Sequence, residues 1–204
     1  MNGKSITTTL DKVFRWITNL AFLNVLWVAF TILGLGILGI FPATTAALGV
    51  ARKWLKGDHE IRIWPTFKQI YREEFKSANI LGWILAVVGY LFFLNYQIIH
   101  LAEGDLPFIV PFLYYFILFL YITIVIWVFP LLVHNYASII HQLKNALIIG
   151  ITKIHITVTL ILLLFSMMYF SLEFPVLLVF FTFSLLALVW MWLSLRVFVK
   201  IFKE

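Results

Sequence analysis

Long stretches without a charged side chain dominate the hydrophobic pattern of this chain of 204 residues. Five stretches contain no Asp, Glu, Lys or Arg: Trp16–Ala51, Ser77–Ala102, Leu106–Leu143, Ile154–Leu172 and Phe174–Leu195. A helix needs roughly 20 apolar residues to cross a bilayer, and it satisfies its own backbone hydrogen bonds within lipid. Barrel strands would alternate in polarity over short segments, whereas these runs are continuously apolar. The pattern therefore predicts an all-α, polytopic transmembrane helical bundle of five or six spans, in a single domain over residues 1–204.

The first apolar run is too long for one crossing. As a helix, residues 16–51 would extend ~54 Å, against a hydrocarbon core of ~30 Å. The run contains Gly34, Gly36 and Gly39, followed by Pro42, and these residue types weaken or interrupt a helix. We predict a broken helix or hairpin over residues 17–55. One helix covers residues 17–33, and a second at 42–55 crosses fully, re-enters or lies at the surface.

Amphipathic segments flank this run. Residues 1–16 predict an interfacial helix, because apolar residues recur at helical spacing after Ser5 while Lys12 and Arg15 lie off that stripe. Residues 52–78 predict a second amphipathic segment, which lies on the membrane surface and leads into the next span. Residues 80–199 predict four spans, at Ile80–Leu101, Phe108–Val133, Lys153–Ser171 and Val176–Val199.

The positions of lysine and arginine predict the topology, because cytoplasmic loops hold an excess of both. Segment 52–76 contains seven of them, and connectors 102–107 and 172–175 contain none. We therefore expect a bacterial cytoplasmic-membrane protein with 52–76, 134–153 and the C-terminus inside. Lys4, Lys12 and Arg15 favour an internal N-terminus as well. A hairpin at 34–42 satisfies this with six crossings, and the alternative is five spans with the N-terminus outside.

Composition excludes several classes of function. The chain is 63% hydrophobic and 12% charged, and it contains no cysteine, which rules out thiolate catalysis and Cys-ligated metals. Its net charge of +6 lies beside apolar spans, so an anionic inner leaflet explains it better than nucleic acid. The G-x-G-x-x-G match at 34–39 lies in an apolar run and lacks the strand that a dinucleotide site needs. Glu73 and Glu74 are interpreted as a solvated helix face. We expect no enzyme activity, no cofactor and no metal site.

A few polar residues remain as candidates. Asn24, Asn95 and Gln97 are the most polar groups in or near the spans, and either hydrogen bonds between helices or a polar substrate path would explain them. His134 and His141 are seven residues apart, but no carboxylate lies near them in the sequence. A basic set in segment 52–78 is the candidate for docking a partner or contacting lipid: Arg52, Lys53, Lys56, Lys68, Arg72 and Lys76.

Residues 20–82 resemble a known family. The similar elements are L-N-x-L-W, a glycine-rich stretch leading into F-P-A-T-x-A, then V-x-R-K-W and the run F-K-x-x-Y-R-x-E-F-x-x-A-N-x-x-G. They resemble the YesL-like bacterial membrane proteins, a domain of unknown function. The resemblance implies an association with polysaccharide use and with sugar-importing ABC transporters, and it supplies no functional residues.

Two hypotheses for the function follow. The first is a non-enzymatic accessory component of carbohydrate uptake that docks an ABC-type transporter or another membrane partner through its basic segment. The second is a small solute transporter or channel in its own right, which self-associates and in which the broken helix lines the substrate site.

Overall fold

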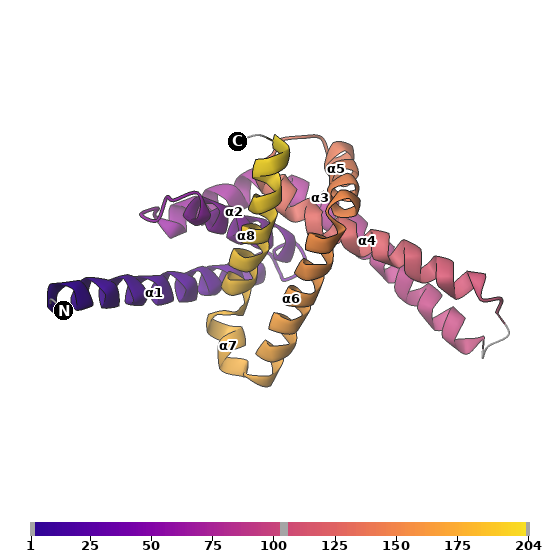
Figure 1. Cartoon of the computed structure of the whole chain (residues 1–204), viewed down its shortest axis with the longest axis horizontal. Helices are drawn as coiled ribbons and strands as arrows, with labels where there is room; N and C mark the ends of the chain where they lie inside the picture. The colour runs from indigo at the N-terminus through magenta and orange to yellow at the C-terminus, as the bar shows by residue number, and fades with distance from the viewer. Residues whose placement is uncertain (1–2, 103–105, 203–204) are drawn as a thin grey trace.

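The computed structural model describes the backbone of residues 3–102 and 106–202, and the side chains of the same ranges from Leu10 onward. Within those ranges the chain forms eight helices and no strand, which confirms the all-α class. The helices are α1 (Gly3–Leu33), α2 (Ile40–Leu55), α3 (Ile63–Leu101), α4 (Ile109–His134), α5 (Ile139–Thr152), α6 (Ile154–Glu173), α7 (Pro175–Phe180) and α8 (Thr182–Phe202). Figure 1 shows α1, the α3–α4 hairpin and the α6–α7–α8 hairpin leaving a common centre in different directions.

The first apolar run folds back on itself. Helix α1 runs without interruption to Leu33, so the N-terminal amphipathic stretch and the first apolar helix are one helix. The chain then turns through residues 34–39, where Gly36 adopts a positive φ of 73°, a conformation that glycine accepts without a Cβ clash. The rings of Trp16 and Trp54 lie 5.5 Å apart, and Trp27 Nε1 donates to Thr44 Oγ1 at 3.1 Å. These contacts pair the two helices in antiparallel order.

Five helices of the described chain are long and apolar enough to cross a membrane: Leu10–Leu33, Ile63–Leu101, Ile109–His134, Ile154–Glu173 and Thr182–Phe202. They identify a multi-pass membrane protein. Helix α2, the second arm of the predicted hairpin, has 16 residues and is ~24 Å long, shorter than the hydrocarbon core. It is therefore absent from the five, and most of its residues are buried by other helices.

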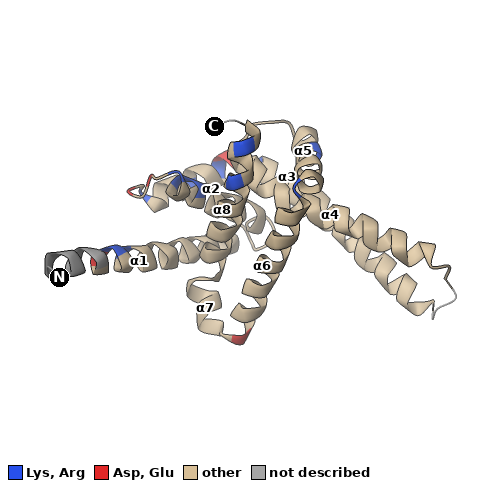
Figure 2. Ribbon diagram, in the orientation of Figure 1, with Lys and Arg blue, Asp and Glu red and all other residues tan. Residues whose placement is uncertain are grey.

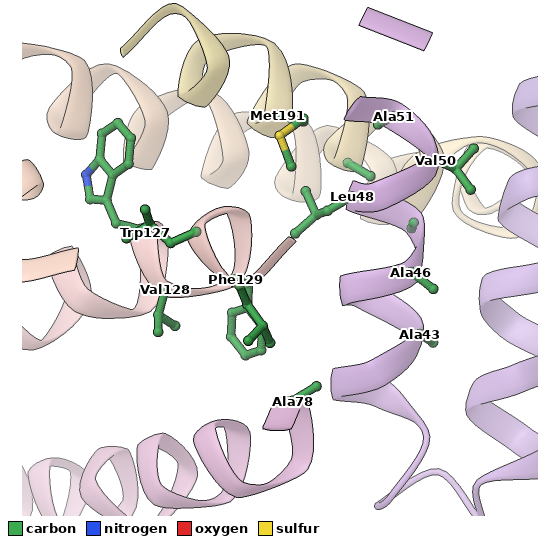
Figure 3. Close-up of a cluster of buried hydrophobic side chains, with 14 of the residues drawn as sticks. Ala43, Ala46, Leu48, Val50, Ala51, Ala78, Trp127, Val128, Phe129 and Met191 are labelled. Atoms are coloured by element: carbon green, nitrogen blue, oxygen red, sulfur yellow. The ribbon is translucent and has the colours of Figure 1, made fainter. Parts of the chain in front are cut away.

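Helix α2 lies at the centre of the fold and contacts α1, α3, α4 and α8. Figure 3 shows Ala43, Ala46 and Ala51 of α2 among side chains of α3, α4 and α8. All three alanines are fully buried, and their small size lets neighbouring backbones approach closely. Gly82 of α3 makes a similar approach, because a Cβ at this position would lie 2.2 Å from Cγ of Phe41.

Helix α3 joins the predicted amphipathic segment to the predicted span without a break, over 39 residues. Two polar side chains attach it to the hairpin. Tyr71 Oη donates to the carbonyl of Phe30 at 3.3 Å, and Asn79 Nδ2 donates to the carbonyl of Leu38 at 3.0 Å. Asn79 thereby donates to a carbonyl of the turn that accepts no backbone hydrogen bond within α1 or α2.

The last predicted span, residues 176–199, is interrupted. Helix α7 ends at Phe180 and α8 starts at Thr182. The amide of Asn24, a fully buried side chain of α1, fills the gap. Its Nδ2 donates to the carbonyls of Leu178 and Val179 at 3.3 and 2.6 Å, and its Oδ1 accepts from the backbone N–H groups of Phe183 and Ser184 at 2.8 and 3.3 Å. One side chain therefore caps the end of one helix and the start of the next.

Replacing Asn24 should destabilise the fold. An Asn24→Leu variant leaves the backbone groups at the α7–α8 break unpaired, at about 1–3 kcal/mol for each buried group. We expect the midpoint of thermal unfolding in detergent to fall by about 5–10 °C. Asn95→Leu is the matched control, because Asn95 is exposed and bonds only to the carbonyl of Leu91 in its own helix. Equal unfolding temperatures for the two variants would contradict this role of Asn24.

Candidate functional site

Basic side chains from three helices gather at one end of the molecule. We call this the basic end, and it comprises Arg52, Lys53, Lys56, Lys68, Arg72, Lys76, Arg196 and Lys200. Figure 2 shows blue segments on α2, α3 and α8 in the part of the molecule that contains the C-terminus, and further blue segments on α1 and α5. Helices α4 and α7 and the outer part of α3 carry no blue or red segment. The basic residues in the last turns of α2 and α8 also lie where the helix dipole is negative.

Two adjoining polar cavities open at this end. The larger, about 460 Å³, is lined by residues of α3, the end of α4, the 135–138 connection and α5, and we call it the acidic cavity. Its polar lining residues are Glu73, Glu74, Ser77, Asn135, Tyr136, Ser138 and Gln142. The smaller, about 200 Å³, shares Glu73, Glu74 and Tyr136 and is also lined by Arg52, Lys53 and Gln69. The carboxylates of Glu73 and Glu74 therefore lie between the acidic cavity and the smaller cavity, which Arg52 and Lys53 make basic.

His134 connects three helices beside these cavities. Arg52 Nε of α2 donates to Nδ1 of His134 at the end of α4, at 3.3 Å. The ring of His134 also packs against Phe198 of α8, with centroids 4.6 Å apart. His134 is thus engaged in packing, and His141 is exposed on α5. The described residues contain no group of three His, Cys, Asp or Glu side chains that could hold a metal ion.

Glu74 departs from the interpretation of Glu73 and Glu74 as a solvated face. Glu73 is exposed and accepts a hydrogen bond from Gln69 Nε2 at 2.8 Å, whereas Glu74 is only 8% exposed. The physical reason is position, because Glu74 lies seven residues after Phe67 and four before Ala78, both fully buried. At helical spacing these residues share one face. That stripe was visible in the sequence and identifies Glu74 as an inward carboxylate.

The predicted basic set divides between two surfaces. Arg52 and Lys53 are half-buried and line the smaller cavity, while Lys56 and Lys76 are exposed. On the outer side of α3, an open hollow of about 520 Å³ is lined by Trp64, Pro65, Lys68, Gln69, Arg72 and Glu73, and we call it the α3 groove. The basic residues of α3 thus lie on the face opposite the core.

The three residues of the predicted polar path are not brought together. Asn24 is buried at the α7–α8 break with its amide fully hydrogen-bonded. Asn95 and Gln97 are exposed on the outer part of α3. Gln142 and Asn135, which line the acidic cavity, were not identified from the sequence. Their proximity depends on the fold of the connection between α4 and α5, for which the sequence carries no motif.

Comparison with known proteins identifies the relatives of this chain. A family described as "Protein of unknown function, DUF624" matches residues 20–96, which run from α1 through most of α3. The chain is similar to three uncharacterized proteins of Bacillus subtilis (strain 168). Identity to YteU is 32% over 196 residues, covering 95% of this chain and 88% of the relative. For YesV it is 30% over 197 residues, covering 95% of both chains, and for YesL it is 29% over 194 residues, covering 95% and 91%.

No solved structure matches the chain. The resemblance carried by residues 20–82 is confirmed, because the family match covers the same segment and the relatives extend it over nearly the whole chain. These relatives are uncharacterized, so the chemistry of the site follows from its own residues. The chain belongs to the YesL-like, DUF624 family of multi-pass membrane proteins.

Proposed function

We propose that the protein is a non-enzymatic accessory component of the bacterial cytoplasmic membrane that docks a partner through the α3 groove. The observation that carries the proposal is the division of α3 into two faces. Its inner face packs on α2, and its outer face presents Lys68, Arg72 and Trp64 around an open hollow. Arginine and tryptophan are enriched in the residues that dominate binding energy at protein interfaces.

The chemistry of the groove favours a protein partner with an acidic, partly apolar surface. Trp64 is 48% exposed, and Pro65 beside it offers a rigid apolar contact. Lys68 and Arg72 supply charge that steers an acidic partner and fixes its register. Simple binding to anionic lipid is the competing explanation, since lysine and arginine near a membrane surface attract anionic headgroups. An ABC-type transporter and a role in carbohydrate uptake are proposed on the family resemblance alone.

Charge reversal in the groove tests this function. We expect an Arg72→Glu variant to reduce co-purification of the partner from native membranes by about tenfold, which corresponds to ~1.4 kcal/mol. Lys144→Glu is the matched control, because Lys144 is an exposed lysine of α5 outside the groove. The measurement is quantitative mass spectrometry after affinity purification in mild detergent at native abundance. Recovery of the wild-type protein alone, or equal loss with both variants, would refute docking through the groove.

One observation favours the second function, a solute transporter. Interrupted membrane helices often line substrate sites, and the α7–α8 break is such an interruption. In this protein Asn24 occupies the hydrogen-bonding groups at the break, which leaves them unavailable to a solute. The same groups could serve a substrate only if the side chain of Asn24 moved away. Docking therefore has the stronger support.

The proposed topology places the basic end inside the cell, and the cysteine-free sequence makes it testable by single-cysteine labelling. Lys56→Cys and Asp11→Cys should both react with a membrane-impermeant maleimide only after permeabilisation, because the hairpin returns α2 beside α1. Glu173→Cys, at the far end of α6, should react in intact cells. Labelling of Asp11→Cys in intact cells would refute the internal N-terminus and leave the docking proposal standing.

A further inference from the structure

The acidic cavity has the opposite charge to the end of the molecule that contains it. Glu73 and Glu74 line it, and no lysine or arginine does. The chain as a whole has a formal net charge of +6, but Arg52 and Lys53 line the smaller cavity and Lys68 and Arg72 line the α3 groove. A neutral or anionic ligand would find better partners elsewhere on the basic end. The cavity is therefore suited to a cation.

Gln142 places a second acceptor in the wall of this space. Its side chain is 1% exposed, and its Nε2 donates to the carbonyl of Asn135 at 2.5 Å. A carbonyl only accepts hydrogen bonds, so the amide nitrogen must face Asn135 and the oxygen must face the other way. That oxygen, Oε1, is buried and has no hydrogen-bond partner among the described residues. Because Gln142 lines the cavity, this unsatisfied acceptor belongs to the cavity wall.

Glu74 adds an unpaired carboxylate to the same wall. It is 8% exposed, and within the described part of the chain it forms no hydrogen bond or ion pair. Burying a carboxylate without a partner is unfavourable, because the low-dielectric surroundings replace water poorly. A buried acceptor such as Oε1 of Gln142 is unfavourable for the same reason. One ligand that donates to both groups would relieve both penalties.

The size of the cavity and its small number of metal-ligating side chains argue against a bare metal ion as the ligand. Its volume of about 460 Å³ is within the range of sites for small organic molecules and far exceeds that of an ion. Divalent ions such as Ca²⁺ take six to eight oxygen ligands, whereas the described residues hold no cluster of three His, Cys, Asp or Glu. Water would satisfy the acceptors without neutralising Glu74.

We propose that the acidic cavity binds the primary ammonium group of a small amine, with Glu74 and Oε1 of Gln142 as its acceptors. A primary ammonium offers three N–H donors and no acceptor, which complements these groups. Its third donor reaches Glu73 or the hydroxyl of Ser77, both on the cavity wall. The cavity lies where α4, a helix long enough to span the membrane, ends at His134. An aminophospholipid headgroup and a free amine both present this chemistry.

Calorimetric titration of the full-length protein in detergent micelles tests the proposal. The probes are ethanolamine and phosphatidylethanolamine, with choline and phosphatidylcholine as controls that carry the charge without N–H donors. We expect saturable binding of the primary amines and at least about tenfold weaker binding of the quaternary ones. Saturation by phosphatidylethanolamine alone identifies a lipid source, and saturation by ethanolamine identifies a free amine. Equal affinity for primary and quaternary partners, or no saturation by either primary amine, would overturn the proposal and leave a water-filled cavity.

Two variants locate the binding. Glu74→Gln keeps the shape and removes the charge, and we expect it to weaken binding about tenfold or more. Gln142→Met removes the buried acceptor and should weaken binding several-fold. Glu60→Gln, an exposed acid outside the cavity, is the matched control and should bind as the wild type does. Wild-type affinity in a folded Glu74→Gln variant would refute the site. Partner recovery through the α3 groove is a separate measurement, so this test is independent of the proposed docking function.

Discussion

Helices in a bilayer gain little from burying apolar side chains against one another, because lipid tails are as apolar as leucine. Close backbone approach and hydrogen bonding therefore decide which helices associate. In this protein both requirements meet at α2, whose buried alanines allow α1, α3, α4 and α8 to converge on a helix too short to span the core alone. The three arms of the fold extend from that centre, and each arm contains a helix that contacts α2.

Interruptions in the helices are stabilised by side chains from other helices. Asn79 of α3 donates to the turn between α1 and α2, and Asn24 of α1 bridges α7 and α8. Backbone groups left unpaired within lipid would be strongly unfavourable, so each break needs such a partner. The two asparagines thus serve the architecture. The polar groups that line open cavities lie instead at the basic end, where α4 meets the 135–138 connection.

The parts of this fold that depend on local sequence could be predicted, and the parts that depend on distant partners could not. The end of α1 at Leu33 and the turn beyond it follow from glycines within one short segment. The break at Phe181 has no such signal, since residues 176–184 contain neither glycine nor proline. It depends on Asn24, which lies more than 150 residues away in the sequence. Gln142 was missed for the same reason, because its orientation depends on the fold of the preceding connection.

Glu74 was accessible to prediction, and its position determines how the two proposed surfaces relate. It faces inward on α3, and Lys68 and Arg72 line the groove on the outer side of the same helix. Glu73 lines both the acidic cavity and the α3 groove, so its carboxylate is shared between the two surfaces. An ammonium group in the cavity would neutralise part of the negative charge at the edge of a groove that otherwise selects an acidic partner. By linkage, any effect of the amine on partner affinity has to be matched by an equal effect of the partner on amine affinity. The sign of that effect follows from Coulomb's law, because reducing the negative charge at Glu73 strengthens the attraction of the groove for an acidic surface.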